Sequence, residues 1–216
     1  MSEPADIFDS EAEHYDRWFE TPEGRVLFAN ELQAIRLLWR DEFRPALEIG
    51  VGTGRFAQAL GVESGIDPAP GALRLARQRG LRVEVACGEA LPFASGSLAG
   101  ALLLTTLCFA ADARTLLREA ARVLRPGGHL LVGDIPADSP WGREYLRKKA
   151  EGHPYYRSAR FYTVDNLMKY LREAGFAPVG FASTLVRSRP GAPEMEPARP
   201  GLVPDAGFVC ILAQKP

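Results

Sequence analysis

The chain is 216 residues long, with 46% hydrophobic residues, 25% charged residues and a formal net charge of −1. This length suits a single domain, residues 1–216, with a substantial buried core. The nearly balanced charge offers no electrostatic basis for nucleic acid as the main partner.

No stretch of the chain is typical of export or of membrane insertion. The N-terminus carries acids where a signal peptide carries basic residues, and the longest mostly apolar run, residues 98–111, is too short to span a bilayer. Cys87, Cys108 and Cys210 are odd in number and lack the paired spacing of metal ligands. We therefore expect a cytoplasmic protein with no membrane partner and no bound metal, and we leave its oligomeric state open.

Residues 1–40 are expected to be helical and to form an N-terminal cap or lid. Ser10 and Glu13 fit a capping box, and Thr21 before Pro22 is typical of a helix start with proline at its first position. Four apolar residues then recur every three or four positions, which predicts a helix packed on the core: Phe28, Leu32, Ile35 and Trp39.

Residues 14–19 combine three aromatic rings with an imidazole and charges of both signs. Two interpretations fit this composition equally: an amphipathic cap on the core, or a lid over a ligand pocket. His14 and Tyr15 are candidates for a general base if the reaction uses one.

Residues 46–57 turn from a short apolar strand into a glycine-punctuated loop and then into a helix. Gly50, Gly52 and Gly54 permit a sharp turn and a close approach of bare backbone to a ligand. The following helix aims unpaired N–H groups at the same place. Glu48 narrows the class of ligand, because a carboxylate beside the loop opposes a pyrophosphate but can hold a cationic amine.

A second strand is expected to end at Asp67, where an acid can accept hydrogen bonds from both hydroxyls of a ribose. A ligand with a ribose, a positive amine and no phosphate satisfies both Glu48 and Asp67. S-Adenosylmethionine is the common cofactor of this description.

With these residues the chain resembles the class I S-adenosylmethionine-dependent methyltransferases, in particular small bacterial members with E-x-G-x-G-x-G, L-P-F and L-R-P-G-G motifs. The three motifs occupy residues 48–54, 91–93 and 124–128. The resemblance implies S-adenosylmethionine as cofactor and S-adenosylhomocysteine as product. The cofactor-binding residues that we expect are Tyr15, Glu48, Gly50, Gly52, Gly54, Asp67, Pro68, Gly88, Glu89 and Thr105.

One position departs from the family pattern. Members of the family often carry an Asp before the L-P-F turn that contacts the adenine amino group, and Cys87 stands there in this chain. Adenine recognition is therefore expected to depend on Glu89 or on backbone groups.

The continuous apolar run of residues 98–104 predicts a central parallel strand covered on both faces. Thr105, Thr106 and Cys108 follow at its carboxyl end, where open α/β sheets place their ligands. They are candidates to line the methyl-transfer site, although strand-end packing is favoured for Cys108. His129 begins the next predicted strand at the opposite end and is interpreted as structural.

Residues 136–162 depart from the generic core, and we expect them to cover the ligand crevice as an inserted segment. Asp138 or Ser139 before Pro140 predicts a helix start, and His153 and Tyr156 complete the candidate bases. Six basic residues either attract an anionic acceptor or form a solvated helix face, the commoner role of a charge run: Arg143, Arg147, Lys148, Lys149, Arg157 and Arg160.

The alternation of strands and helices predicts an α/β fold. The resemblance adds a doubly wound, mostly parallel seven-stranded sheet, the Rossmann-like methyltransferase fold, with helices on both faces and an antiparallel last strand. Residues 188–206, with five prolines, are expected to form a long loop between antiparallel edge strands.

The function that we expect is methyl transfer to a small-molecule acceptor by direct in-line displacement, with proximity and exclusion of water supplying most of the rate. Two alternatives stay open. Residues 52–57 fit the G-x-G-x-x-A pattern of a nicotinamide-dependent oxidoreductase, although Glu48 argues against it. A sensor or partner module that binds the cofactor without turnover is compatible with the unusual Cys87.

Overall fold

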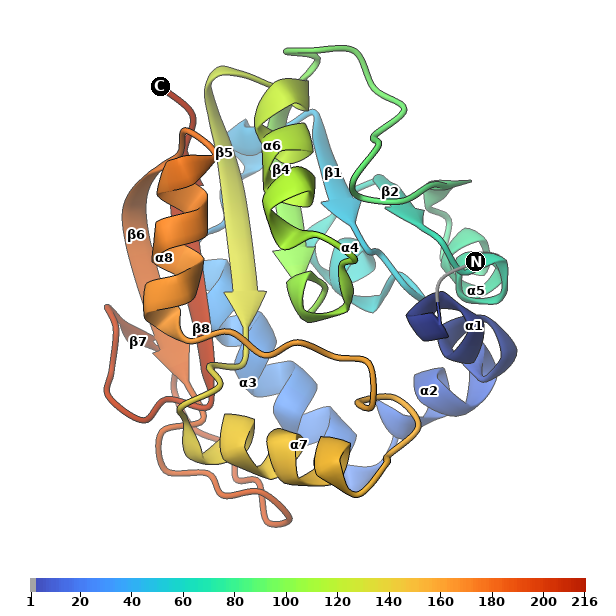
Figure 1. Ribbon diagram of the computed structural model, residues 1–216, viewed down its shortest axis with the longest axis vertical. Helices are drawn as coiled ribbons and strands as arrows, with labels where there is room; N and C mark the ends of the chain where they lie inside the picture. The colour runs from blue at the N-terminus through green and yellow to red at the C-terminus, as the bar shows by residue number, and fades with distance from the viewer. Residues whose placement is uncertain (1–2) are drawn as a thin grey trace.

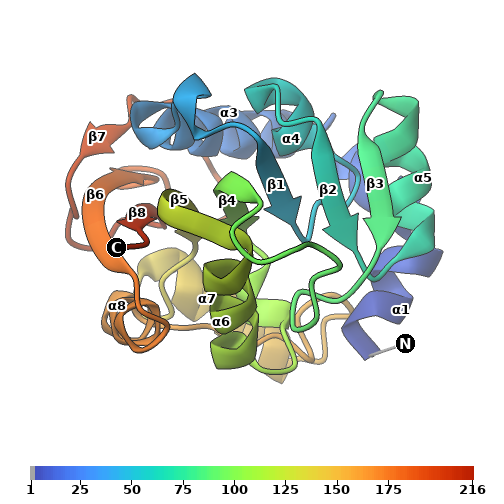
Figure 2. The same cartoon turned by 90° about the horizontal axis from the view of Figure 1, so that it is seen from above.

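The computed structural model describes residues 3–216, so residues 1 and 2 of the expected N-terminal segment lie outside the described range. A twisted sheet runs through the molecule, and helices cover both of its faces (Figures 1 and 2). The strands are β1 (Ala46–Ile49), β2 (Ser64–Asp67), β3 (Arg82–Val85), β4 (Leu98–Leu104), β5 (Leu124–Asp134), β6 (Ala177–Thr184), β7 (Arg199–Pro200) and β8 (Phe208–Gln214).

The helices fall into two layers and a group beyond the strand ends. They are α1 (Glu3–Ser10), α2 (Ala12–Trp18), α3 (Pro22–Leu38), α4 (Arg55–Leu60), α5 (Pro70–Gln78), α6 (Ala113–Val123), α7 (Pro140–Ala150) and α8 (Val164–Glu173), with short 3-10 turns η1 (Asp41–Phe43) and η2 (Leu107–Phe109). In Figure 2, α3, α4 and α5 lie on one side of the sheet, and α6 and α8 lie on the other. Figure 1 shows α1, α2 and α7 beyond the carboxyl ends of the central strands.

The strand order is β3-β2-β1-β4-β5-β8-β6-β7. Strands β1 to β5 pair in parallel, and β8 is antiparallel to both β5 and β6. The predicted doubly wound, mostly parallel sheet with an antiparallel last strand is confirmed. The expectation of antiparallel edge strands is wrong for β8, because it lies inside the sheet, and the two-residue β7 adds an eighth strand at the edge.

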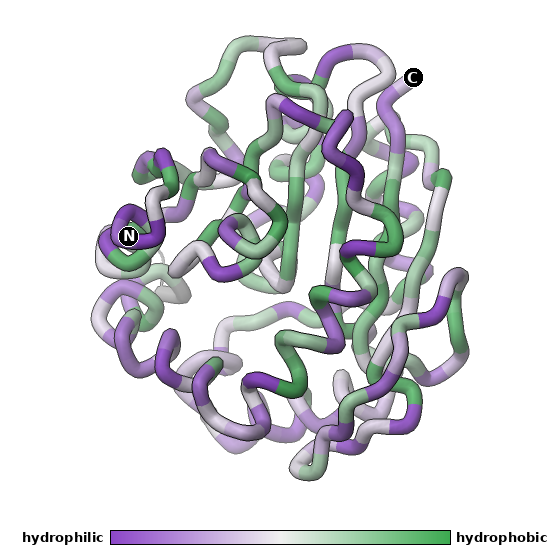
Figure 3. The backbone as a smooth tube through the Cα atoms, turned by 180° about the vertical axis from the view of Figure 1, so that it is seen from behind, coloured by the Kyte–Doolittle hydropathy of each residue, from purple (hydrophilic) through white to green (hydrophobic). Residues whose placement is uncertain are grey.

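The core lies on both faces of the sheet because its central strands are apolar along their whole length. All seven residues of β4 are buried. Leu102 and Leu104 pack in the cluster formed with α3, α4 and α5, whereas Leu103 packs in the cluster formed with α6 and α8. Figure 3 shows the hydrophobic strands and the alternating hydropathy of the helices that cover them.

Helix starts agree with the sequence signals in two cases and disagree in one. Thr21 caps α3 by accepting a hydrogen bond from the Gly24 N–H at 3.0 Å, and Ser139 caps α7 in the same way through Gly142. The Ser10 capping box is wrong: its hydroxyl donates to the Asp6 carbonyl, so Ser10 ends α1 and does not cap α2.

The strand expected to begin at His129 is longer than predicted. β5 already begins at Leu124, within the L-R-P-G-G motif, where it pairs with Leu98. The proline-rich segment of residues 188–206 is attached to α3, because the Asn30 amide donates to the Glu194 carbonyl at 2.8 Å and accepts from the Glu196 N–H at 3.1 Å.

No helix of residues 3–216 combines the length and apolar content needed to cross a membrane.

Candidate functional site

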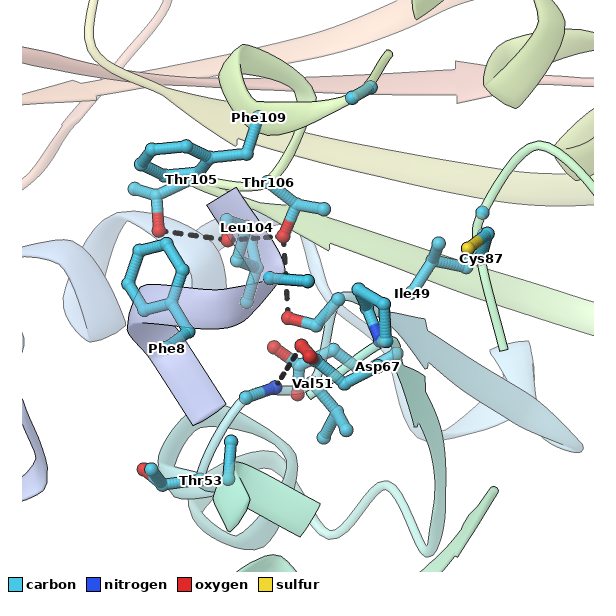
Figure 4. Close-up of a pocket in the computed structure, with 18 of the residues that line it drawn as sticks. Phe8, Ile49, Val51, Thr53, Asp67, Cys87, Leu104, Thr105, Thr106 and Phe109 are labelled. Carbon is cyan, nitrogen blue, oxygen red and sulfur yellow. Dashed lines mark hydrogen bonds between the residues drawn. The ribbon is translucent and has the colours of Figure 1, made fainter. Parts of the chain in front are cut away.

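A cavity of about 200 Å³ lies at the carboxyl ends of β1, β2 and β4. Its floor is the glycine loop after β1 and the turn after β4 (Figure 4). Its cover comes from α1 and α2. Nine of the ten residues expected to bind the cofactor line it: Tyr15, Glu48, Gly50, Gly52, Asp67, Pro68, Gly88, Glu89 and Thr105.

The glycine loop has left-handed backbone conformations, with φ of +74° at Gly50 and +52° at Gly52. A β-carbon on Gly50 would lie 2.2 Å from the Thr106 side chain, so only glycine permits this packing. No atom lies within 4 Å of the β-carbon position of Gly52, which leaves its backbone open to a ligand. Gly54, the tenth expected residue, does not line the cavity; a β-carbon there would meet Leu81 and Ala76, so this glycine serves helix packing.

Asp67 connects the ends of β1 and β2. Its carboxylate accepts a hydrogen bond from the Gly52 N–H at 2.9 Å (Figure 4). It accepts a second one from the Ala69 N–H, also at 2.9 Å. Burial raises the pKa of Asp67, and the two N–H groups counteract this by stabilising the charged form. The carboxylate is thereby held in a fixed orientation at the wall of the cavity.

Glu48 is the residue that best tests the fit of a cationic amine. Its side chain is buried, with 2% of its surface exposed, and its Oε2 atom has no hydrogen-bond partner among the described residues. Burial raises the pKa of Glu48 to about 8, and the nearby Asp67 charge adds to the rise, while the Ala57 N–H opposes it. A buried carboxylate oxygen without a partner is costly, and a positive amine in the cavity would satisfy it. The site therefore fits the amine of S-adenosylmethionine.

The turn after β4 is held in a strained conformation. Thr105 has a φ of +47°, which a β-branched residue rarely adopts, and its N–H donates to the Gly133 carbonyl at 2.8 Å. The Thr106 hydroxyl is shared between the carbonyls of Leu104, at 2.9 Å, and Gly50, at 3.3 Å (Figure 4). These contacts hold the end of β4 against the glycine loop. The two parts of the cavity floor are therefore fixed relative to each other.

The wall after β3 contains the position where the family often has an acid. Cys87 is exposed and lines the cavity, and Gly88 lies so close to Leu116 that a β-carbon there would be 2.7 Å from it. The Glu89 carboxylate accepts hydrogen bonds from the N–H groups of Ala111, at 2.8 Å, and Asp112, at 3.3 Å. Glu89 thus joins this wall to the loop before α6.

Aromatic rings form the cover. Tyr15 packs edge-on against Phe8 at 5.3 Å and against Phe19 at 5.5 Å, and Phe8 packs edge-on against Phe109 at 5.0 Å. Tyr155, from the inserted segment, contacts both Phe8 and Tyr15. The cover therefore joins α1, α2, η2 and residues 151–163 into one aromatic cluster.

The candidate bases fall in different environments. Tyr15 lines the cavity, and burial raises the pKa of its hydroxyl well above the ordinary value. His14 is exposed beside Asp9 and Arg74 in a separate surface groove, so its placement does not support a role as a base. Tyr156 and His153 stack on each other at 4.7 Å, and the buried Nδ1 atom of His153 has no hydrogen-bond partner among the described residues.

The basic residues of the inserted segment do not line the cavity. Arg147 pairs with Glu144 and Glu151, Lys149 donates to the Ala159 carbonyl and Arg160 to the Ala111 carbonyl. Of their two interpretations, the structure supports local surface contacts. His129, at the far end of the sheet, stacks on Phe43 at 4.2 Å, which confirms its structural interpretation. Among residues 3–216, no group of three or more His, Cys, Asp or Glu side chains is placed to hold a metal ion.

Some cavity residues were missed by the sequence analysis. Phe8 and Phe109 are 101 positions apart, and no local spacing connects them. Arg55 was passed over as the variable position after Gly54, yet it lines the cavity and pairs with Asp16 of α2 at 2.8 Å.

Comparison with known proteins, like the geometry of the cavity, points to a methyltransferase. Residues 47–132 match the family model of the methyltransferase domain. An uncharacterized protein of Mycobacterium tuberculosis is 43% identical over 94% of this chain and 72% of its own length, and one of Methanocaldococcus jannaschii is 34% identical over 97% and 98%.

A crystal structure from Thermotoga maritima superposes with a TM-score of 0.90 and 37% identity over 97% of this chain and 99% of that one. It is described as an S-adenosylmethionine-dependent methyltransferase, possible histamine N-methyltransferase. The chain belongs to the class I S-adenosylmethionine-dependent methyltransferases, with S-adenosylmethionine as the cofactor that the fold implies. This class replaces the nicotinamide-dependent oxidoreductase alternative.

Proposed function

We propose that this enzyme transfers the methyl group of S-adenosylmethionine to a small-molecule acceptor by direct in-line displacement. The observation that carries the proposal is the unpartnered, buried Glu48 carboxylate oxygen at the wall of an aromatic-covered cavity. The description of the Thermotoga maritima protein, which names a small molecule, also supports a small acceptor.

Different residues of the cavity would bind different groups of the cofactor. Glu48 would hold the amine and Asp67 the ribose hydroxyls, while the open backbone at Gly52 would allow close approach. When bound, S-adenosylmethionine supplies an electrophilic methyl group on a positively charged sulfur. The cover formed by Phe8, Tyr15 and Phe109 would exclude water from the reacting atoms and so favour direct attack.

The burial of Tyr15 and Tyr156 determines whether their hydroxyls can act as general bases. Burial raises the pKa values of both Tyr15 and Tyr156, so their hydroxyls stay protonated near neutral pH. Protonated phenols donate hydrogen bonds and do not act as bases. Tyr15, which lines the cavity, is therefore assigned to positioning the acceptor, and proximity supplies most of the rate.

Calorimetry followed by a transfer screen tests the proposal. We expect S-adenosylhomocysteine to bind and NAD to give no heat, because a buried carboxylate repels a pyrophosphate. A screen of small metabolites with methyl-labelled cofactor should then give labelled product. Binding of NAD in place of S-adenosylhomocysteine would contradict the cofactor assignment, and cofactor binding without any labelled product would favour the sensor alternative.

A further inference from the structure

One side of the cavity is formed by aromatic rings. The rings of Phe8, from α1, and Phe109, from η2, meet edge-on at 5.0 Å, and the ring of Tyr15, from α2, packs edge-on against Phe8 at 5.3 Å. All three side chains line the cavity and are half-buried. In Figure 4, Phe8 and Phe109 lie together on one side of the site, and Asp67 and Cys87 lie on the other. The expected ribose partner is thus away from the aromatic side, which remains for the methyl acceptor.

Half-buried rings at the wall of a cavity favour an apolar occupant. Apolar surface gains free energy when a ligand removes it from water, and rings add a preference for other rings in edge-on or offset contact. Phe8 meets Phe109 at an interplanar angle of 77° and Tyr15 at 85°. A flat ligand among these three rings is therefore offered both ring edges and ring faces.

The cavity lining has no unpaired charge for an ionic acceptor beyond the acids assigned to the cofactor. The charged side chains of residues 3–216 that line it are Glu48, Arg55, Asp67 and Glu89. Glu89 already accepts hydrogen bonds from two backbone N–H groups of the loop before α6. Arg55 donates to the Glu20 carboxylate at 2.7 Å and to the Asp16 carboxylate at 2.8 Å.

Two charged residues near the aromatic side are also withdrawn from a ligand. Arg160 donates to the Ala111 carbonyl at 2.9 Å. Glu31, on α3, is buried and does not line the cavity, and burial, which no neighbouring charge or donor counteracts, raises its pKa to about 8. Glu31 is therefore mostly uncharged near neutral pH. An ionic acceptor would lose its hydration without gaining a partner, whereas a neutral acceptor does not bear this cost.

Thr105 supplies a hydrogen-bond acceptor on the aromatic side. It lines the cavity in the turn that leads to Phe109, and Figure 4 shows its hydroxyl turned to the Leu104 carbonyl. The hydroxyl donates its proton to that carbonyl at 2.9 Å, so the lone pairs of the oxygen are its remaining capacity. The left-handed backbone of Thr105, with a φ of +47°, is of the strained kind that persists where orientation matters for function. Thr105 is thus suited to a ligand that carries a proton on its polar atom.

We propose that the methyl acceptor is a neutral aromatic molecule bound among Phe8, Tyr15 and Phe109, whose nucleophilic O–H or N–H group donates a hydrogen bond to Thr105. The inference rests on the proposed methyl transfer and names its substrate class. Phenols and anilines share this chemistry, because both are uncharged near neutral pH. By accepting the hydrogen bond, Thr105 positions the nucleophilic atom and leaves a lone pair of that atom free for attack.

The transfer step balances without a charged partner for the acceptor. The lone pair of the acceptor oxygen or nitrogen forms the bond to the methyl carbon, and the carbon–sulfur bond breaks with its electron pair staying on sulfur. The proton of the nucleophilic atom is released to solvent. A neutral acceptor and a sulfonium ion thus give a neutral methylated product, a neutral thioether and one solvated proton, so the total charge is unchanged.

Binding of matched probes tests this class without relying on turnover. The protein is saturated with S-adenosylhomocysteine and titrated calorimetrically with p-cresol, p-toluidine and p-xylene, which share one shape and differ in one group. 4-Methylcyclohexanol removes the aromatic ring, and benzylamine and benzoate add a positive or a negative charge. 2-Naphthol and 2-methylnaphthalene repeat the comparison on a larger skeleton.

Variants of Thr105 test its role. Thr105→Val removes the oxygen at nearly the same shape, and the Leu104 carbonyl keeps a donor because the Thr106 hydroxyl also donates to it at 2.9 Å. Thr105→Ser keeps the hydroxyl. The matched control is Thr115→Val, in α6 and outside the cavity lining, which also removes a hydroxyl that hydrogen bonds within its own turn, in this case to the Asp112 carboxylate.

We expect the wild-type protein to bind p-cresol, p-toluidine or 2-naphthol at least about tenfold more tightly than benzylamine and benzoate, because the charged probes find no partner. Binding should also be about threefold tighter than that of 4-methylcyclohexanol, because the ring contacts are lost. Relative to the methyl analogue, Thr105→Val should weaken binding of the hydroxyl or amino probe about fivefold, the ratio of one neutral hydrogen bond. Thr105→Ser and Thr115→Val should retain the wild-type ratio. All three variants should bind S-adenosylhomocysteine like the wild type, which shows that they are folded.

Several results overturn the inference. Tighter binding of benzylamine or benzoate would assign an ionic acceptor, and 4-methylcyclohexanol binding as well as p-cresol would remove the aromatic preference. Absence of binding on both skeletons rejects the class. An unchanged ratio in Thr105→Val, or a loss of S-adenosylhomocysteine binding in that variant, would show that Thr105 does not position the acceptor. Absence of S-adenosylhomocysteine binding in the wild type would instead reject the proposed function, so the two failures are distinguishable.

Discussion

The Arg55 guanidinium donates hydrogen bonds to both carboxylate oxygens of Asp16, at 2.9 and 2.8 Å, and thereby joins the cover helix α2 to the start of α4 directly after the glycine loop. Arg79 donates to the same carboxylate at 2.8 Å and to the Thr53 carbonyl, also at 2.8 Å. The three side chains are only 15–19% exposed, so solvent screens them weakly. The aromatic cover is thus fixed to the cofactor loop by an ion-pair network.

Asp16→Ala should loosen this cover. Two arginines would lose their shared partner, and we expect a loss of about 2 to 4 kcal/mol in the free energy of unfolding, between the values for exposed and buried pairs. Hydrogen exchange of residues 8–20 should accelerate, and S-adenosylhomocysteine should slow it in the wild type. The control is Glu13→Ala, whose exposed pair with Arg74 should be worth less than about 1 kcal/mol. Unchanged exchange in Asp16→Ala would mean that the aromatic contacts alone hold the cover in place.

Asp67→Ala should weaken cofactor binding. The substitution removes the acceptor of two backbone N–H groups as well as the expected ribose partner, so we expect affinity for S-adenosylhomocysteine to fall by about 1.5 to 3 kcal/mol. Calorimetry measures the loss. Asp165→Ala, at an exposed position in the first turn of α8, should bind like the wild type. Wild-type affinity in a folded Asp67→Ala protein would remove Asp67 from the binding site.

The parts of the site that the sequence predicted are those encoded by local spacing. Glu48, Gly50, Gly52 and Asp67 lie at the ends of neighbouring parallel strands, and parallel strands bring their carboxyl ends to one edge. The apolar run of β4 fixed its central position in the same way, because only a strand covered on both faces can be apolar at every residue.

The parts that the sequence did not predict depend on contacts between distant segments. The Asp16, Arg55 and Arg79 network joins three elements, and none of its spacings is a motif. The burial of Glu31 was missed for another reason: charged residues on an amphipathic helix are assigned to its solvent face. It lies three residues after Phe28 and four before Ile35, so the helical period itself placed it on the apolar face.

Glu48→Gln should change stability and binding in opposite directions. The amide keeps the shape of the side chain and removes a buried, incompletely paired carboxyl, so the ligand-free protein should become more stable. Binding of S-adenosylhomocysteine should weaken by about 1.5 to 3 kcal/mol, because its amine loses a charged partner. Thermal melting and calorimetry measure the two effects, with the exposed Glu84→Gln as control. Weaker binding together with lower stability would mean that Glu48 is needed for the fold of the loop.

The stability of the ligand-free protein should fall as the pH rises from about 4 to 8. Burial raises the pKa values of Glu31 and Glu48 to about 8 and that of Asp134 to about 7, whereas these groups titrate near pH 4 in an unfolded chain. The folded protein therefore holds more protons than the unfolded one across this range. The contribution of each acid to the free energy of unfolding is present below pH 4 and is lost as the pH rises to the pKa of the folded state. Asp16 acts in a separate range, since its arginine partners help to lower its pKa to about 2, and its contribution is lost only on strong acidification.

Thermal melting between pH 5 and 8 measures this dependence, and each kcal/mol corresponds to a shift of about 2 to 4 °C for a chain of this size. Glu31→Gln and Glu48→Gln should each flatten the profile, because a glutamine does not titrate. Saturation with S-adenosylhomocysteine should also flatten it, since the bound amine keeps Glu48 ionised at lower pH and compensates its charge. A melting temperature that rises steadily from pH 5 to 8 in the ligand-free wild type would show that the buried acids are already ionised and paired, and the unpartnered state of Glu31 and Glu48 would then be wrong.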